Sequence, residues 1–173
     1  MKICIIGPSP KGDEKRKTWT DWKVEYKKKL GKLGNVEIVY GDMWLNETKP
    51  LVTFGHDSNM IKNSDIVVAN AESKIGAGTA QEFLVAKYFT KPVITVLPKD
   101  SHHRRSNIVF EGVMIKDWIH PFLFSTSDLI VEKINDCLDW IKEYQKNPKS
   151  KNIKDIKIID KSIKAYLDEI KKL

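Results

Sequence analysis

The chain has 173 residues, of which 41% are hydrophobic and 9% aromatic, and its formal net charge is +7. This length suits one domain of about 100–200 residues, and the composition excludes an intrinsically disordered chain. No apolar run approaches the roughly 20 residues of a membrane helix, and the apolar start is too short for a signal peptide. The two cysteines, Cys4 and Cys137, offer no disulfide framework. We therefore expect a soluble cytoplasmic protein that does not bind membranes.

The positive charge lies at the two ends of the chain. Residues 1–34 carry a net charge of +6, residues 35–145 carry −4, and residues 146–173 carry +5. Nucleic-acid-binding surfaces usually place aromatic side chains among their positive charges. The C-terminal lysines are instead spread around a helix, as on a solvated surface. This distribution argues against nucleic acid as a partner.

Strands and helices alternate through the first hundred residues. The pattern predicts strands over residues 2–6, 36–40, 65–70 and 92–96. Between them it predicts a helix from about Thr18 to Leu30, a short helix capped by Asp57 that runs to Asn63, and a helix from Thr79 to about Phe89. The strand over residues 65–70 is rich in β-branched side chains, as is typical of a central parallel strand.

The last third of the chain has a weaker pattern. Residues 98–126 are expected to contain one short last strand, and residues 127–145 a helix. A linker over residues 146–151 then leads to a final amphipathic helix. Its apolar stripe must pack on the body or on a partner subunit, and it consists of Ile156, Ile159, Ile163, Tyr166, Ile170 and Leu173.

This alternation predicts an α/β fold. We expect a doubly wound, Rossmann- or flavodoxin-like parallel sheet of four to five strands, with C-terminal helices. Residues 1–145 would form the α/β domain, and residues 146–173 the Lys-rich linker and amphipathic helix. Ligands of such sheets bind beyond the carboxyl ends of the strands. The site is therefore expected among residues 7–17, 41–57, 70–82 and 98–107.

The densest chemical signal is the segment Gly76-x-Gly78-Thr79-Ala80-x-Glu82. Two glycines before a helix let a ligand approach the backbone, whose N–H groups favour anionic or hydroxyl-rich groups. The segment lacks the third glycine of the dinucleotide fingerprint and the Gly-Lys-Ser/Thr of a P-loop. A simpler interpretation makes Thr79 and Glu82 a capping box, and Asp57 the N-cap of its helix.

Taken together, Glu82 and Asp57 favour catalysis. Both acids are expected at the starts of neighbouring helices, above the same end of the sheet. Two carboxylates that face one cleft suit cleavage at an acetal-like carbon, one as nucleophile and the other handling protons. The positive end of the helix would keep Glu82 ionised, and its charge would stabilise an oxocarbenium-like transition state.

The segment from Asp57 to Ile94 resembles the nucleoside 2-deoxyribosyltransferase family. The resemblance rests on the spaced Asp57, the strand SDIVVAN at residues 64–70, and the helix start GxGTAxE at residues 76–82. The same superfamily contains 2'-deoxynucleoside 5'-phosphate N-hydrolases. The likeness covers roughly residues 2–97 and leaves residues 146–173 outside.

The resemblance implies specific roles. Glu82 would attack C1' of deoxyribose to form a covalent glycosyl-enzyme, and Asp57 would orient the sugar or assist protonation of the leaving base. Transfer to a second base returns a nucleoside, and transfer to water makes the enzyme a hydrolase. No metal or organic cofactor is expected, the substrate is a small nucleoside or nucleotide, and the protein is expected to be a homo-oligomer. The substrate-binding residues would be Gly7, Pro8, Ser9, Asn70, Gly76, Gly78, Thr79 and Ser106.

The chain departs from the family pattern in two places. The family commonly has a tyrosine near the end of strand one, where this chain has none. Trp19, Trp22 and Tyr40 are candidates for an aromatic wall instead. The phosphate-specific hydrolases place a serine where this chain has Gly76, although Ser106 falls near a serine that they borrow from a neighbouring subunit.

Basic residues could meet a substrate phosphate or belong to ordinary solvated loops. They are Lys11, Lys15, Arg16, Lys17, Arg104 and Arg105. His102 and His103 are followed by no third ligand at a regular spacing, so no metal site is predicted.

Two other functions stay open. A phosphoribohydrolase of the cytokinin-activating type has a similar GGxGTxxE loop, but Lys74 and Ile75 stand where it has Pro-Gly, and Asp57 would be unexplained. A non-catalytic nucleotide-binding or sensor domain of the same fold would also carry these residues.

Overall fold

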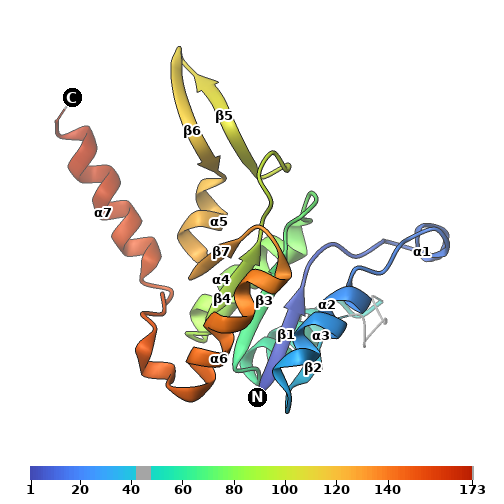
Figure 1. The fold of residues 1–173 in the computed structure, drawn as a ribbon. Coiled ribbons are helices and arrows are strands. Elements are labelled where there is room, and N and C mark those ends of the chain that lie inside the picture. Colours follow the sequence, from blue (N-terminus) through green and yellow to red (C-terminus); the bar gives the residue numbers. More distant parts are fainter. Residues whose placement is uncertain (42–47, 173) are drawn as a thin grey trace.

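A five-stranded parallel sheet forms the centre of the computed structural model, which describes residues 1–41 and 48–172. The strand order is β2-β1-β3-β4-β7, and every neighbouring pair is parallel (Figure 1). This is the flavodoxin-like order, in which the chain reverses direction across the sheet at β1 and β3. The predicted fold class is confirmed. The strands are β1 (Lys2–Ile6), β2 (Glu37–Val39), β3 (Ile66–Asn70), β4 (Val93–Val96) and β7 (Leu129–Val131).

Helices cover both faces of the sheet. Helices α2 (Lys23–Leu30) and α6 (Leu138–Lys146) pack on one face, together with the short turn η3 (Ile134–Cys137). Helices α3 (Pro50–Lys62), α4 (Ala77–Tyr88) and α5 (Pro121–Thr126) pack on the other. Among residues 1–41 and 48–172, none of the helices combines the length and apolarity needed to cross a bilayer.

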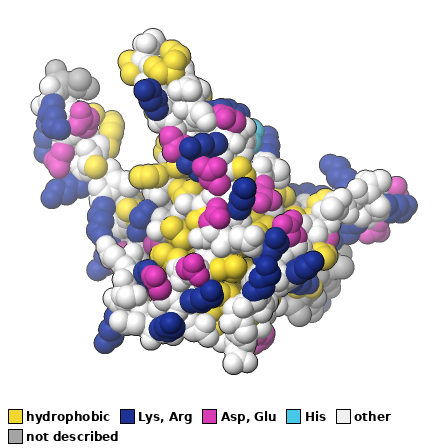
Figure 2. Space-filling model, viewed as in Figure 1, with side chains coloured by type: hydrophobic (Ala, Val, Ile, Leu, Met, Phe, Trp, Pro, Cys, Tyr) yellow, Lys and Arg dark blue, Asp and Glu magenta, His cyan; other side chains and the backbone are white. Residues whose placement is uncertain are grey.

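Two elements project from this body. An antiparallel hairpin is formed by β5 (Arg104–Phe110) and β6 (Val113–Ile119), and the chain ends in α7 (Ile158–Ile170). Both extend away from the sheet on the same side (Figure 1). Figure 2 shows hydrophobic side chains at the tip of the hairpin and on the side of α7 that faces it. Residues 98–126 were expected to hold one short strand. That prediction is wrong, because they form the two strands of this hairpin and α5.

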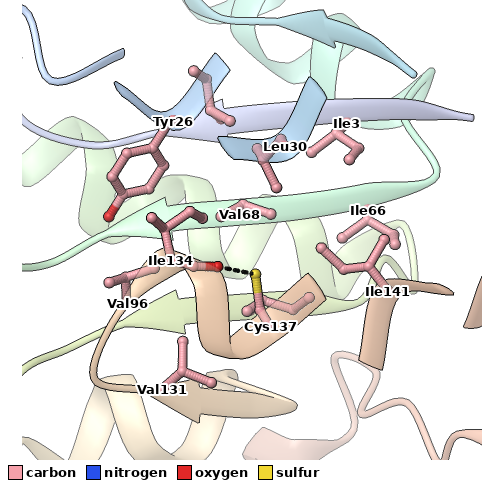
Figure 3. Close-up of a cluster of buried hydrophobic side chains, with 12 residues drawn as sticks. Ile3, Tyr26, Leu30, Ile66, Val68, Val96, Val131, Ile134, Cys137 and Ile141 are labelled. Carbon is pink, nitrogen blue, oxygen red and sulfur yellow. Dashed lines mark hydrogen bonds between the residues drawn. The ribbon is translucent and has the colours of Figure 1, made fainter. Parts of the chain in front are cut away.

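The alternation of side chains along the strands builds two separate cores. On β1, Ile3 and Ile5 contact the α2 and α6 layer, whereas Cys4 and Ile6 contact the α3 and α4 layer. Figure 3 shows the first of these cores, in which the Cys137 thiol donates a hydrogen bond to the Ile134 carbonyl oxygen at 2.9 Å. Continuous apolar strands that are buried on both faces are what a doubly wound sheet requires.

The predicted helix from Thr18 to Leu30 starts about five residues later than expected. In the structure α2 begins at Lys23, and a separate short helix, α1 (Asp13–Lys17), lies before Thr18. The Asp21 carboxylate accepts a hydrogen bond from the Lys23 backbone N–H at 3.0 Å. Such a local side-chain bond gives the backbone an alternative to the helix, which explains the late start.

The predicted helix over residues 127–145 is also wrong in its first half. Residues Leu129–Val131 form β7, which pairs with β4, and α6 begins at Leu138. Leu129, Ile130 and Val131 suit a strand as well as a helix, and pairing with the sheet decides between them.

A buried ion pair holds the last strand and the C-terminal segment to the body. The Lys87 ammonium group on α4 donates hydrogen bonds to the Asp128 carboxylate and to the Lys91 carbonyl oxygen. Asp128 also accepts hydrogen bonds from the backbone N–H groups of Val93, at 2.7 Å, and Lys154, at 2.8 Å. Both charged side chains of the pair are almost fully buried. Each charge is therefore compensated inside the protein.

We expect Lys87→Met to lower the free energy of unfolding by about 3 kcal/mol, because it leaves the Asp128 carboxylate buried without its cation. Lys142→Met is the matched control, since Lys142 pairs with Asp139 on the surface and should contribute below about 1 kcal/mol. Urea denaturation of both variants measures the difference. Equal losses in the two variants would contradict this account of the pair.

Candidate active site

A pocket of about 520 Å³ lies at the carboxyl ends of β1, β2 and β3. Its walls come from the loop after β1, from α3, from residues 74–76 and from the first turns of α4. This position is the switch point of the sheet, where ligands of such folds bind. Most of the predicted site residues line this one pocket: Gly7, Pro8, Ser9, Asp57, Gly76, Gly78, Thr79 and Glu82. Residues 42–47, part of the stretch expected to contribute here, lie outside the described residues, as does Leu173.

Two predicted residues do not line it. Asn70 ends β3, and its side-chain oxygen accepts a hydrogen bond from the Glu72 backbone N–H at 3.0 Å, so it shapes the turn behind the pocket. Ser106 lies on β5, where its backbone N–H and its hydroxyl group donate hydrogen bonds to the Asp100 carboxylate, each at 2.8 Å. These hydrogen bonds lower the pKa of Asp100.

Glu82 lies in the second turn of α4. The helix starts at Ala77, two residues earlier than expected, and its N-cap is Gly76, so Thr79 is not the N-cap and the predicted capping box is wrong. The Thr79 hydroxyl group instead donates a hydrogen bond to the Gly7 carbonyl oxygen at 3.0 Å. Thr79 thereby fixes the start of α4 to the loop after β1, and the capping interpretation no longer accounts for Glu82.

Asp57 lies in the middle of α3, and its predicted role as an N-cap is wrong. This helix begins at Pro50, whose fixed φ suits a first helical turn. The Asp57 carboxylate is 2.9 Å from His56 Nδ1. A Cβ atom at Gly41 would lie 3.0 Å from the same carboxylate, so the absence of a side chain there gives Asp57 its room. His56 and Gly41 fall within the stretch 41–57 where the site was expected, but the sequence predicted no role for either, since their only signals are adjacency to Asp57 and a place just after strand two.

The carboxylates of Glu82 and Asp57 both influence the pKa of the Cys4 thiol. Cys4 is buried at the middle of β1, and burial raises the pKa of its thiol. The negative charges of Glu82 and Asp57 raise that pKa further. Both acids therefore lie within electrostatic reach of one sulfur atom. The thiol therefore stays protonated at neutral pH, and Cys4 is a core residue.

Two of the three candidate aromatic side chains line the pocket. Trp22 and Tyr40 both contribute, whereas Trp19 is not among the lining residues. Trp22 Nε1–H donates a hydrogen bond to the Pro8 carbonyl oxygen at 2.8 Å, which fixes the indole ring against the loop after β1. The Lys27 ammonium group lies 3.8 Å from the centre of the Tyr40 ring.

Four cationic side chains among the described residues line the same pocket. Lys11, Arg16, Lys23 and Lys74 line it, whereas Lys15 and Lys17 do not. The Lys23 ammonium group is buried, 3.0 Å from the Asp21 carboxylate and 4.2 Å from the centre of the Trp19 ring. The pocket thus combines two carboxylates with several cations.

The other predicted cations have structural roles. Arg104 donates hydrogen bonds to the Asp117 carboxylate at 2.7 and 2.9 Å and to the Leu97 carbonyl oxygen at 3.1 Å. The hydrogen bonds to Asp117 raise the pKa of Arg104. This side chain therefore fastens the base of the hairpin to the end of β4. Arg105 does not line the pocket and donates a hydrogen bond to the Arg104 carbonyl oxygen at 3.2 Å.

His103 supports the loop that carries Gly76. Its Nε2 atom accepts a hydrogen bond from the Ile75 backbone N–H at 3.2 Å. Burial, helped by the positive charges of neighbouring side chains, lowers the pKa of His103 to about 4. The ring is therefore neutral at neutral pH and able to accept this bond. Within residues 1–41 and 48–172, His, Cys, Asp and Glu side chains form no group of three or more suited to a metal ion.

The chain matches solved structures but neither family models nor curated proteins. The solved structure of the CMP N-glycosidase BcmB from Clostridium botulinum has a similar backbone trace, with a TM-score of 0.45 and 16% sequence identity. The alignment covers 82% of this chain and 98% of that one. Likeness of this degree is too low to assign that activity to this chain.

Glycines of the pocket offer a test of its packing. We expect Gly7→Ala to lower the free energy of unfolding by about 2 kcal/mol, because the new Cβ would lie 2.7 Å from the Trp22 ring. Gly78→Ala is the matched control, since a Cβ there meets nothing within 4 Å and should stabilise α4 by about 0.5 kcal/mol. Thermal denaturation of both variants measures the effects, and an unchanged Gly7→Ala variant would refute the close packing.

Proposed function

We propose that this protein cleaves the N-glycosidic bond of 2'-deoxynucleosides and transfers the deoxyribose to a second base, through a covalent glycosyl-enzyme on Glu82. The observation that carries the proposal is the pair of carboxylates, Glu82 from α4 and Asp57 from α3, on the wall of one pocket. Its volume of about 520 Å³ falls in the range of pockets for small molecules.

Glu82 is the proposed nucleophile. It follows the N-terminal turn of α4, where the helix dipole favours an ionised carboxylate. In the first step a Glu82 oxygen bonds to C1' of the sugar, the bond from C1' to the base nitrogen breaks, and its electron pair leaves with the base.

Asp57 is the proposed proton-handling group. Its carboxylate is held by His56, so the pair can deliver a proton to the departing base. In the second step a nitrogen of the incoming base bonds to C1', and the bond from C1' to Glu82 breaks and regenerates the carboxylate. The proton lost by the incoming base returns to the Asp57 and His56 pair, which completes the cycle.

The remaining walls suit the two halves of a nucleoside. Trp22 and Tyr40 provide aromatic side chains against which a planar base can pack. The backbone at Gly76 and Gly78 borders open space, since a Cβ at either position would meet nothing within 4 Å. A sugar can therefore approach the N–H groups at the start of α4.

The proposal predicts that Glu82→Gln abolishes base release and base exchange, with a loss of at least roughly a thousandfold in kcat. Chromatography of 2'-deoxynucleosides incubated with enzyme, with and without a second free base, measures both reactions. Dependence on the second base separates transfer from hydrolysis. Mass spectrometry of the acid-quenched wild type should find one deoxyribosyl group on the peptide that contains Glu82.

The matched control is Glu111→Gln, which makes the same change at the exposed tip of the hairpin and should leave turnover unchanged. Full activity in Glu82→Gln would refute the nucleophile. If the wild type binds a deoxynucleoside but turns over none, the chain is a binding module, and Glu82→Gln should then retain that affinity.

The cations on the pocket favour a second candidate, hydrolysis of 2'-deoxynucleoside 5'-monophosphates. Lys11, Arg16 and Lys74 place cations on the pocket wall that a neutral nucleoside does not need, whereas Lys23 is paired with Asp21. Charge-assisted hydrogen bonds to a phosphate are among the strongest available to a protein. With water as acceptor, the same two carboxylates would release the base and a deoxyribose 5-phosphate.

For this candidate we expect Arg16→Met to raise KM for monophosphates about tenfold while leaving KM for nucleosides unchanged. Lys15→Met is the neighbouring control, since Lys15 does not line the pocket. Steady-state kinetics on matched nucleoside and monophosphate pairs give the comparison. Equal effects on both substrates would argue for the neutral nucleoside.

A further inference from the structure

The chain exposes more surface than a compact monomer of its size. Its accessible surface is 10916 Å² for a mass of 19.9 kDa. Folded monomers of that mass expose roughly 8,700 Å², so the excess is about 2,200 Å². The hairpin and α7, which project from the body, account for it in part (Figure 1).

Much of the surface on these two elements is apolar. Monomeric soluble proteins rarely expose large contiguous apolar patches, and one that does so usually binds a partner there. The exposed apolar residues of the hairpin lie around its tip (Figure 2): Val109, Phe110, Val113, Met114 and Ile115. Those of α7 form the stripe Ile159, Ile163, Tyr166, Leu167 and Ile170, each between 42% and 63% exposed.

The α7 stripe has the spacing of a packed helix face. Its residues recur at three and four positions, as on helices that bury one side, while Lys161 and Ala165 occupy the opposite side. A helix with such a stripe is stabilised mainly by packing it against something. Among the described residues, the chain itself leaves this face exposed.

The start of α7 is fixed to the body, which gives the stripe a defined position. The Lys154 backbone N–H donates a hydrogen bond to Asp128 at 2.8 Å. The Lys154 ammonium group donates hydrogen bonds to the Phe124 and Ser127 carbonyl oxygens at 2.9 and 2.6 Å. The helix therefore begins from an anchored segment on the same side of the molecule as the hairpin.

We propose that the α7 stripe and the hairpin tip form a self-association surface, covered in solution by the same surface of a second copy of this chain. The excess of about 2,200 Å², to which the hairpin and α7 contribute a part, falls within the roughly 1,000–2,500 Å² that each partner buries in a large homodimer, whose interface totals about 2,000–5,000 Å². A two-fold dimer uses one patch on both subunits, so no second patch is needed. Residues 108–115 carry Glu111 as their one charge, so like-charge repulsion between two tips is small. The surface lies apart from the pocket, and the proposal does not depend on the proposed function.

Sedimentation equilibrium of the full chain from about 1 to 100 µM tests this surface. We expect the wild type to have twice the chain mass, and Ile163→Glu and Met114→Glu each to raise the dimer Kd at least about tenfold. Ala165→Glu adds the same charge on the opposite side of α7 and should leave Kd unchanged. All three side chains are exposed in the single chain, so circular dichroism should show unchanged folding.

Two results would overturn the proposal. A wild type that stays monomeric across this range would mean that something other than a second copy covers the surface. A dimer that either Ile163→Glu or Met114→Glu leaves intact would place the contact elsewhere, since the proposed surface requires both elements. The two variants lie on separate elements, so misfolding of one leaves the other as a test. Base release by the same preparations reports separately on the pocket.

Discussion

The buried Asp128 carboxylate connects α4, β4 and the segment before α7. It receives the Lys87 ammonium group from α4, the Val93 N–H from the start of β4, and the Lys154 N–H from the segment before α7. The Asp128 side chain thus fixes the C-terminal end of α4, the helix that carries Glu82 in its second turn. It also fixes the segment that leads into α7. Because the charge is buried and paired, any displacement of these elements exposes an uncompensated ion. The pocket wall and the exposed C-terminal helix therefore share one anchor.

The pocket gains its shape from contacts that hold loops close together. Thr79 binds the Gly7 carbonyl oxygen, Trp22 binds the Pro8 carbonyl oxygen, and His103 accepts the Ile75 N–H. Each contact ties a loop at the carboxyl edge of the sheet to a neighbouring element, so the site residues are set before any ligand arrives. Preorganisation of this kind is what the proposed covalent mechanism would require of Glu82. The glycines at residues 76 and 78 leave the remaining space open.

The fold and most of the pocket could be predicted from the sequence because both depend on local patterns. Buried strands and a glycine-rich helix start are readable along the chain, and they located Glu82 and Asp57 at the correct edge of the sheet. The errors have two causes. A contact distant in sequence, the pairing with β4, made Leu129 and its neighbours a strand. Local signals caused the others, because Pro50 starts α3 well before Asp57 and the Asp21 bond to the Lys23 N–H delays the start of α2. His103 was considered only as a metal ligand because its bond to Ile75 spans 28 residues.

The hairpin extends from beside the candidate active site to the proposed self-association surface. Its base is fixed by Arg104, which binds Asp117 across the hairpin and the Leu97 carbonyl oxygen at the end of β4. The residue before Arg104 is His103, which supports the loop of Ile75 and Gly76 on the wall of the pocket. The apolar tip lies at the opposite end of the same two strands. A paired β-ribbon resists sliding of one strand past the other, because each residue of slip would move its side chains to the opposite face. Contacts made at the tip therefore act on a paired element whose base is fixed beside the loop of Ile75 and Gly76.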